Sequence, residues 1–379
     1  MLEATRELMG MIVRRRSCRA FSPGALDGVD LDAMEEAAAG VPTIHGREAG
    51  EAFVVRDPRR AEELGRALLS GWASKVNLWL RRRPPPAYVV CTGDPGVSPV
   101  RSGVHLYNVD AAMAGEAAVL EATARGLGSV WMAAIGEREV VSCLGLAPGR
   151  RVLAVVGIGR PGSGTWDGIT QRALSGKRRP LAQVAYRDRF GRPLDGGGPD
   201  PGRRRDAAAL WPGGGDPARP LVPPPSAAFG GRPRAEEIRA MLEASRWAPN
   251  AENAQIGRWI VVEDPGRIAR VLEAAGAPGA MGAGEFTLIA GAAAPALVSH
   301  RTREQPFAFI DVPIAMVHQI AVAASCGHGW NLLVDVAEDG ARGALGIPGD
   351  HRLVGLLLVG RRTGGDGGGW QQMMERRPR

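Results

Sequence analysis

Residues 107–131 read YNVDAAMAGEAAVLEATARGLGSVW, and residues 308–332 read AFIDVPIAMVHQIAVAASCGHGWNL. Both stretches are long and nearly all apolar, both begin near an aspartate (Asp110 and Asp311), and both lead into a Gly-x-Gly pair. A helix that is apolar on most of its faces is typical of the middle of a protein, where neighbours cover every face. We therefore predict two long, buried central helices, 201 positions apart.

Other landmarks recur at nearly the same spacing. The last apolar runs end in Gly159 and Gly360, again 201 positions apart. Asp57 and Asp264 each follow a short apolar run and precede a proline, and they lie 207 positions apart, so six residues are missing from the middle of the second copy. Similarity at a fixed offset indicates a repeated structural unit. We interpret the chain as two copies of one unit.

Each copy has the pattern of an α+β fold. Short β-type runs such as AYVVCTG (87–93) alternate with helical apolar spacing, which predicts a central sheet with helices packed on it. Residues 191–231 are dominated by proline and glycine, which disfavour long helices and central strands, so we predict an extended linker arm over the surface. The expected organisation is a first domain over 1–190, the linker over 191–231, and a second domain over 232–379 that ends in a loose tail.

The composition limits the class of protein. The 379 residues are 45% hydrophobic, which is ample for a packed core, and the net charge is +7. The arginines form short clusters without interleaved aromatic residues, which favours small anionic ligands such as phosphate over nucleic acid. The four cysteines form no C-x-x-C pair, and no signal peptide or membrane-spanning run is recognisable. We expect a cytoplasmic protein without a metal site or a membrane partner.

Two segments give the copies a family resemblance. RRSCRAF (15–21) and APNAENAQIGRW (248–259), with the order of the later landmarks, resemble the flavin-dependent nitroreductase superfamily over most of 8–190 and 225–365. The resemblance implies two nitroreductase-like α/β/α sandwich domains that form an intramolecular pseudo-dimer. It also implies a flavoprotein in which FMN lies at the interface and takes residues from both copies.

The two copies retain different halves of the implied site. The first copy keeps the arginine-rich segment, whereas its turn, GVPTIHGREAGEAF (40–53), has lost the N-x-Q pattern. The second copy keeps the turn, whereas its first segment, VPPPSAAFGG (222–231), has no arginine. We therefore expect one FMN site and a second, degenerate site. Since one chain supplies both halves, we also expect a monomer that mimics a homodimer.

The arginines of the first segment are candidates for the FMN phosphate. Guanidinium groups bind phosphate oxygens through paired, charge-assisted hydrogen bonds, and a nearby serine can bond the ribityl chain. A solvated basic helix end is the alternative interpretation. The resemblance implies four further contacts with FMN. Two come from a basic segment after the last strand of copy one and from the turn of copy two. The other two are backbone N–H groups after G-L-G, which face flavin N5, and an asparagine that faces the flavin ring. The candidate cofactor-binding residues are Arg15, Arg16, Ser17, Arg19, Asn77, Ala133, Ala134, Lys177, Arg178, Pro249, Asn250 and Asn253.

The resemblance implies an FMN-dependent oxidoreductase that acts on a small organic substrate, with NAD(P)H as a candidate electron donor. The sequence offers no dedicated catalytic acid or base. A flavin-sequestering protein with little turnover is the alternative, and a flavin-free structural pseudo-dimer is a third possibility.

Overall fold

The computed structural model places most of the chain. The described residues are 3–41, 43, 49–71, 73–162, 177–194, 200–210, 221–226, 228–280, 285–294 and 306–362. Part of the predicted degenerate turn (42 and 44–48) and residues 363–379 of the predicted C-terminal tail lie outside the described residues.

The first half of the chain forms a sheet with helices on both faces. The strand order is β1-β2-β6-β5, and every neighbouring pair is antiparallel. Val89 and Val90 are adjacent in β2 and belong to different hydrophobic clusters, because successive side chains of a strand point to opposite faces. One cluster lies under α2 and α5, and the other under α3 and α6. The elements are β1 (Gly50–Val55), β2 (Ala87–Gly93), β5 (Gly128–Met132), β6 (Arg151–Gly159), α2 (Gly28–Ala39), α3 (Pro58–Ala67), α4 (Ala73–Val76), α5 (Tyr107–Ala124) and α6 (Glu137–Leu144).

The second half builds a similar sheet with one additional strand. The order is β10-β11-β9-β8-β7, and only the β7–β8 pair in this sheet is parallel. Strand β7 (Ala185–Arg187) precedes residue 190, so the region expected to be the first domain contributes a strand to the second sheet. The other elements are β8 (Gly257–Val262), β9 (Thr287–Ala293), β10 (His328–Leu333), β11 (Arg352–Arg361), α9 (Ala235–Trp247), α10 (Pro265–Ala274), α11 (Ala308–Ser325) and α12 (Glu338–Leu345).

Matching elements recur at the offsets read from the sequence. Helices α5 and α11 each have 18 residues and begin 201 positions apart. Helices α3 and α10 begin 207 positions apart with the same Asp-Pro start, in which Asp57 and Asp264 accept the N–H groups of Arg60 (2.9 Å) and Arg267 (2.7 Å). An aspartate before the first turn satisfies a free N–H, and proline fits the first helical position. The repeated Asp-Pro pair is therefore a helix start in both halves.

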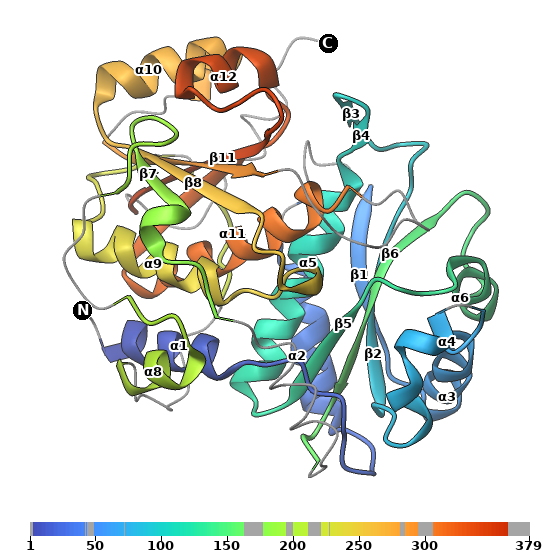
Figure 1. Cartoon of the computed structure of the whole chain (residues 1–379). Helices are drawn as coiled ribbons and strands as arrows, with labels where there is room; N and C mark the ends of the chain where they lie inside the picture. The colour runs from blue at the N-terminus through green and yellow to red at the C-terminus, as the bar shows by residue number, and fades with distance from the viewer. Residues whose placement is uncertain are drawn as a thin grey trace.

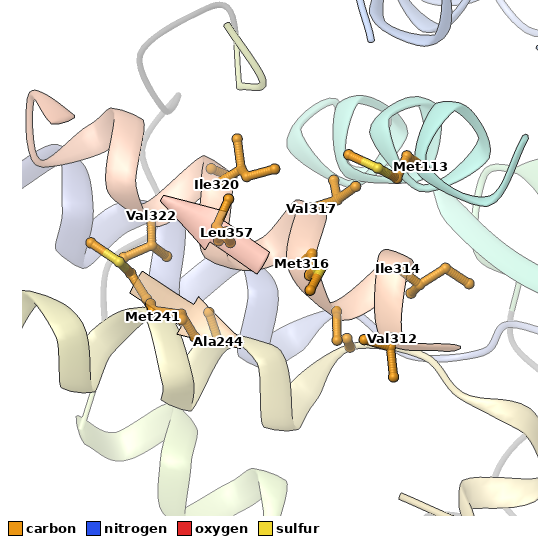
Figure 2. Close-up of a cluster of buried hydrophobic side chains, with 14 of the residues drawn as sticks. Met113, Met241, Ala244, Val312, Ile314, Met316, Val317, Ile320, Val322 and Leu357 are labelled. Atoms are coloured by element: carbon orange, nitrogen blue, oxygen red, sulfur yellow. The ribbon is translucent and has the colours of Figure 1, made fainter. Parts of the chain in front are cut away.

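Helices α5 and α11 pack against each other between the two sheets (Figure 1). Figure 2 shows Met113 of α5 facing Ile314 and Val317 of α11, with Met241 and Ala244 of α9 on the other side of α11. Helix α11 has the length and mean hydropathy (1.5) of a membrane span, and 83% of that window is buried inside the protein, as in any central core helix. The prediction of two buried central helices is confirmed.

A hairpin from the first half inserts into the second. Strands β3 (Val100–Arg101) and β4 (Val104–His105) present Arg101, whose side chain is only 5% exposed. Its guanidinium donates to the carbonyl oxygens of Val334, Leu353 (2.6 Å) and Val354 (3.0 Å), at the strands β10 and β11. It also lies 5.0 Å from the ring centre of Phe309 in α11. This hairpin therefore fastens the two halves together.

In its described residues, the predicted linker includes a helix rather than being extended throughout. Residues Arg204–Leu210 form the helix α8, which packs beside α1 (Glu3–Arg14) and buries Ala207 (Figure 1). Further along, Leu221 and Val222 are buried, and Phe229 pairs with Arg362. The prediction of an extended arm is wrong for residues 204–210, which form a helix whose Ala207 is buried, and removing this apolar surface from water stabilises the helix.

Candidate functional site

Helix α1 ends at a buried arginine. Arg15 is 6% exposed, and its Nε is buried without a hydrogen-bond partner. Burial lowers the pKa of Arg15, and the charge of Glu116 opposes that shift. The chain then passes beside β5, where Ser17 bridges to Ser129 and the N–H of Cys18 donates to the Ser129 carbonyl (2.8 Å). The predicted R-R-S segment therefore lies beside the start of β5, which directly follows the G-L-G motif.

The second-copy turn is closed by its own side chains. Asn250 accepts from the Gln255 N–H (3.0 Å) and donates to the Ala248 carbonyl (3.3 Å), while Pro249 is buried beneath it. Three residues in the turn have left-handed backbone angles: Glu252 (φ 50°), Asn253 (φ 55°) and Gln255 (φ 52°). Only two other non-glycine residues in the described part of the chain do so, Ser102 and Asp188. Such strain costs about 1–3 kcal/mol per residue and gathers at functional sites.

Arg178 joins the two segments. Its Nη1 donates to Asn253 Oδ1 (2.6 Å), and its Nη2 lies 3.3 Å from the Ala248 carbonyl. Burial, together with the charges of Arg15 and Arg246, lowers the pKa of Arg178 to about 9. The structure therefore brings the predicted arginine of the first segment, the predicted basic segment after β6 and the predicted turn to one place.

Two other predicted residues contact each other at the far end of β5. Asn77 is 4% exposed and donates from Nδ2 to the Ala134 carbonyl (2.9 Å). The adjoining Ile135 N–H donates to the Ala133 carbonyl (3.1 Å). Asn77 was expected to face the ligand ring, whereas its amide is used to orient the backbone of Ala134. Ser129 and Ala133 are about 13 Å apart along the extended chain, at ~3.3 Å per residue. The arginine segment beside Ser129 and the Asn77–Ala134 pair therefore lie at opposite ends of an elongated candidate site.

The remaining predicted basic residues are more exposed to solvent than Arg15 and Arg178. Lys177 is exposed, and its backbone carbonyl accepts from Gln255 Nε2 (3.1 Å), so Arg178 is the member of this pair that enters the cluster. Arg16 and Arg19 are half-buried. Arg16 lines a pocket of about 320 Å³ together with Arg15, Ser129 and Pro161.

A comparison with protein families matches one segment of the chain. Residues 101–160 match the sequence model of the nitroreductase family. The nitroreductase match covers the hairpin, α5, β5, α6 and β6, and it includes the predicted Ala133 and Ala134. No curated protein matches the chain.

Several solved structures are similar to parts of the chain. A nitroreductase family protein from Clostridium novyi NT is 23% identical, over 50% of this chain and 97% of its own, with a TM-score of 0.37. An FMN-dependent nitroreductase from Clostridium difficile R20291 is 21% identical, over 41% and 89%, with a TM-score of 0.35. A putative NADH dehydrogenase/NAD(P)H nitroreductase from Bacteroides thetaiotaomicron VPI-5482 is 22% identical, over 41% and 88%, with a TM-score of 0.34.

The position related to Arg15 in the second half has lost its charge. The Ser226 N–H donates to the Trp330 carbonyl (2.7 Å), just as Cys18 does to Ser129, and Ser226 follows Cys18 by 208 positions. At that offset Arg15 corresponds to Pro223, whose carbonyl accepts from the Trp330 indole (2.8 Å). The backbone path recurs in the second half, whereas the cation does not.

Several residues of the site were not predicted. Trp247 lies 5.6 Å below the Arg178 guanidinium, and Gln255 bonds both the turn and the Lys177 carbonyl. Gln255 could have been found, because it completes the N-x-Q pattern of the turn. Arg204 also lies 5.1 Å from the Trp247 ring centre; it belongs to one of the short arginine clusters, in the linker, and it was not among the predicted site residues.

Asp311 supports the turn from beneath. Both of its carboxylate oxygens lie 3.1 Å from the Ala251 nitrogen, and burial raises the pKa of Asp311 to about 7. It lines a small cavity of about 40 Å³ under the turn together with Pro249, Asn250 and Trp259. Asp311, near the start of α11, therefore links the central helix to the turn.

We expect Asp311→Asn to stabilise the ligand-free protein increasingly as the pH rises. The folded pKa lies above the unfolded value of about 3.9, so the buried carboxylate lowers the wild-type free energy of unfolding as the pH rises from about 4 to about 7. Asparagine removes the charge and can still accept the Ala251 N–H. Urea unfolding of both proteins at pH 5 and pH 8 measures the difference, and an equal difference at both pH values would contradict this role.

Proposed function

We propose that the chain is a tandem pair of nitroreductase-like units that binds one FMN between its halves and acts as an FMN-dependent oxidoreductase. The carrying observation is the cluster of Arg15 and Arg178 at the strained turn of the second half. The nitroreductase family match over 101–160 supports the same assignment independently of the arginines.

The cluster has the charge and geometry that a phosphate monoester requires. Two buried guanidinium groups repel each other, and Arg15 Nε has no hydrogen-bond partner among the described residues. Arginine stays protonated in proteins, so the repulsion is a cost that a bound dianion would remove. A phosphate accepts from such forks through charge-assisted hydrogen bonds. The residues present therefore fit the phosphate end of FMN.

The chain's own residues would bind and orient the cofactor. Arg15 and Arg178 would hold the phosphate, and Asn250 and Asn253 would line the turn above the polar chain. Asn77 would fix the Ala134 backbone at the ring end of the site. When bound, FMN supplies hydride and electron transfer to a small organic substrate, with NAD(P)H as the proposed donor.

The proposal includes a single site and a monomer. Pro223 stands where the second site would need an arginine, which supports one cofactor per chain. The contact between α5 and α11, and the strand β7 that joins the second sheet, support an interface supplied within one chain.

A flavin-sequestering protein is the second candidate. The linker helix α8 lies against α1 near the arginine cluster, and such a cover would slow the exchange of a bound flavin. The same site would then hold the cofactor without rapid turnover.

Flavin analysis of the purified protein tests the proposed function. We expect one FMN per chain, a particle of one chain mass, and loss of the flavin absorbance when NADPH or NADH is added without oxygen. Two flavins per chain, or a protein that takes up no FMN, would refute the single site. A tightly held FMN that no nicotinamide bleaches would favour sequestration.

A further inference from the structure

The linker places an arginine beside the predicted phosphate site. Arg204 is the first residue of α8, and its Nη1 donates to the carbonyl of Val13, two residues before Arg15. Its guanidinium lies 5.1 Å from the Trp247 ring centre, and the Arg178 guanidinium lies 5.6 Å from the same ring. Two arginines from distant segments, Arg178 and Arg204, therefore lie against one indole, and Arg15 is close enough for its charge to act on both.

Arg204 is in a strongly positive environment. The pKa of Arg204 is lowered to about 8 by burial, which is the largest cause, together with the charges of Arg15, Arg178 and Arg16. Every charged group that acts on this pKa is thus another arginine. Arg246 differs, because it pairs with Glu243 and with Asp200 (2.7 Å). Gathering cations in this way raises the free energy of the folded protein unless an anion lies among them.

We propose that Arg204 is a third phosphate-binding residue, which the linker contributes to the FMN site. This inference rests on the proposed FMN site and extends it, since it makes residues between the two halves part of the ligand contact. The phosphate would accept hydrogen bonds from three segments: the end of α1, the basic segment at Arg178 and the linker helix. Bound FMN would then hold α8 on α1.

The two flavins FMN and riboflavin separate this role from general packing, because they differ only in the phosphate. For Arg204→Gln we expect the Kd for FMN to rise about 10- to 100-fold, and the Kd for riboflavin to change less than about twofold. Arg203→Gln is the matched control, since it removes the same charge from the neighbouring exposed position and should leave both Kd values unchanged. Flavin fluorescence quenching measures the six affinities, for the wild type and both variants with each flavin.

Protection from trypsin gives a second readout without turnover. Cleavage after Arg204 requires its side chain to leave the Val13 carbonyl and the Trp247 ring, and it is followed by the mass of the fragment that ends at residue 204. We expect FMN to slow that cleavage at least about tenfold in the wild type, riboflavin to have little effect, and Arg204→Lys to retain part of the FMN effect. Equal protection by FMN and riboflavin would overturn the proposal.

The outcomes distinguish the two proposals. If the wild type prefers FMN to riboflavin and Arg204→Gln keeps the same preference, the Arg204 assignment is wrong while the FMN site stands. If the wild type binds neither flavin, the FMN proposal is wrong. In that case the melting temperatures of the wild type and Arg204→Gln are measured with inorganic phosphate and with pyrophosphate. A rise in melting temperature that is the same in both proteins, or no rise in either, would overturn an anion site at Arg204.

Discussion

Replacing Arg15 and Arg178 together by alanine is expected to weaken FMN binding at least about 100-fold. Each charge-assisted hydrogen bond to a phosphate contributes about 1.5–3 kcal/mol, and the double variant removes both buried guanidinium groups. Titration of the flavin-free protein with FMN, followed by fluorescence quenching, measures the change. The expected loss is large because both side chains are shielded from water, where competing hydration is small.

Two comparisons make this prediction specific. Riboflavin should bind the double variant as it binds the wild type, because it has no phosphate. Arg6→Ala with Arg203→Ala removes two exposed charges and should leave FMN affinity unchanged, which controls for the net charge. A double variant that keeps its FMN affinity, or that loses riboflavin equally, would place the phosphate elsewhere.

Arg101→Met should destabilise the folded chain by about 3–5 kcal/mol, without any cofactor present. The change removes a buried charge and leaves the Val334, Leu353 and Val354 carbonyls without their donor. Nearby Glu338 loses an attractive charge, although Arg352 still donates to it at 2.8 and 3.0 Å. Removing one partner from a buried charge network typically costs this much.

Urea unfolding followed by circular dichroism tests the hairpin. Because Arg101 connects the two halves, we expect the variant to unfold at lower urea and to show two transitions if the halves separate. Arg160→Ala is the surface control: Arg160 and Asp27 form a 2.7 Å pair with side chains 56% and 72% exposed, and its loss should cost under ~1 kcal/mol. An Arg101→Met protein as stable as this control would show that the hairpin does not fasten the halves.

Much of the fold could be predicted because it depends on local patterns. The apolar periodicity of α5 and α11, the Asp-Pro helix starts and the repeated glycines are properties of short segments. They recur at fixed offsets, and the structure confirms both sheets and both central helices. The segments of the candidate site were also predicted, because R-R-S and the asparagine turn are local motifs.

The contacts among those segments depend on residues far apart in the chain. The choice of Arg178 over Lys177 depends on a turn about 75 residues later, where Asn253 accepts its hydrogen bond. The hydrogen bond between Asn77 and the Ala134 carbonyl joins residues 57 positions apart. Neither neighbour is visible in the local sequence.

The amino-acid sequence alone indicated which landmarks recur at fixed offsets, where the helices begin and which segment carries the arginines, because periodicity, capping and charge are carried by adjacent residues. Only the folded structure decided that β7 joins the second sheet, that α8 lies on α1, and that Arg204 reaches Trp247. These pairings depend on which surfaces are left uncovered after the central helices pack, and burial of apolar area rather than local preference selects among them.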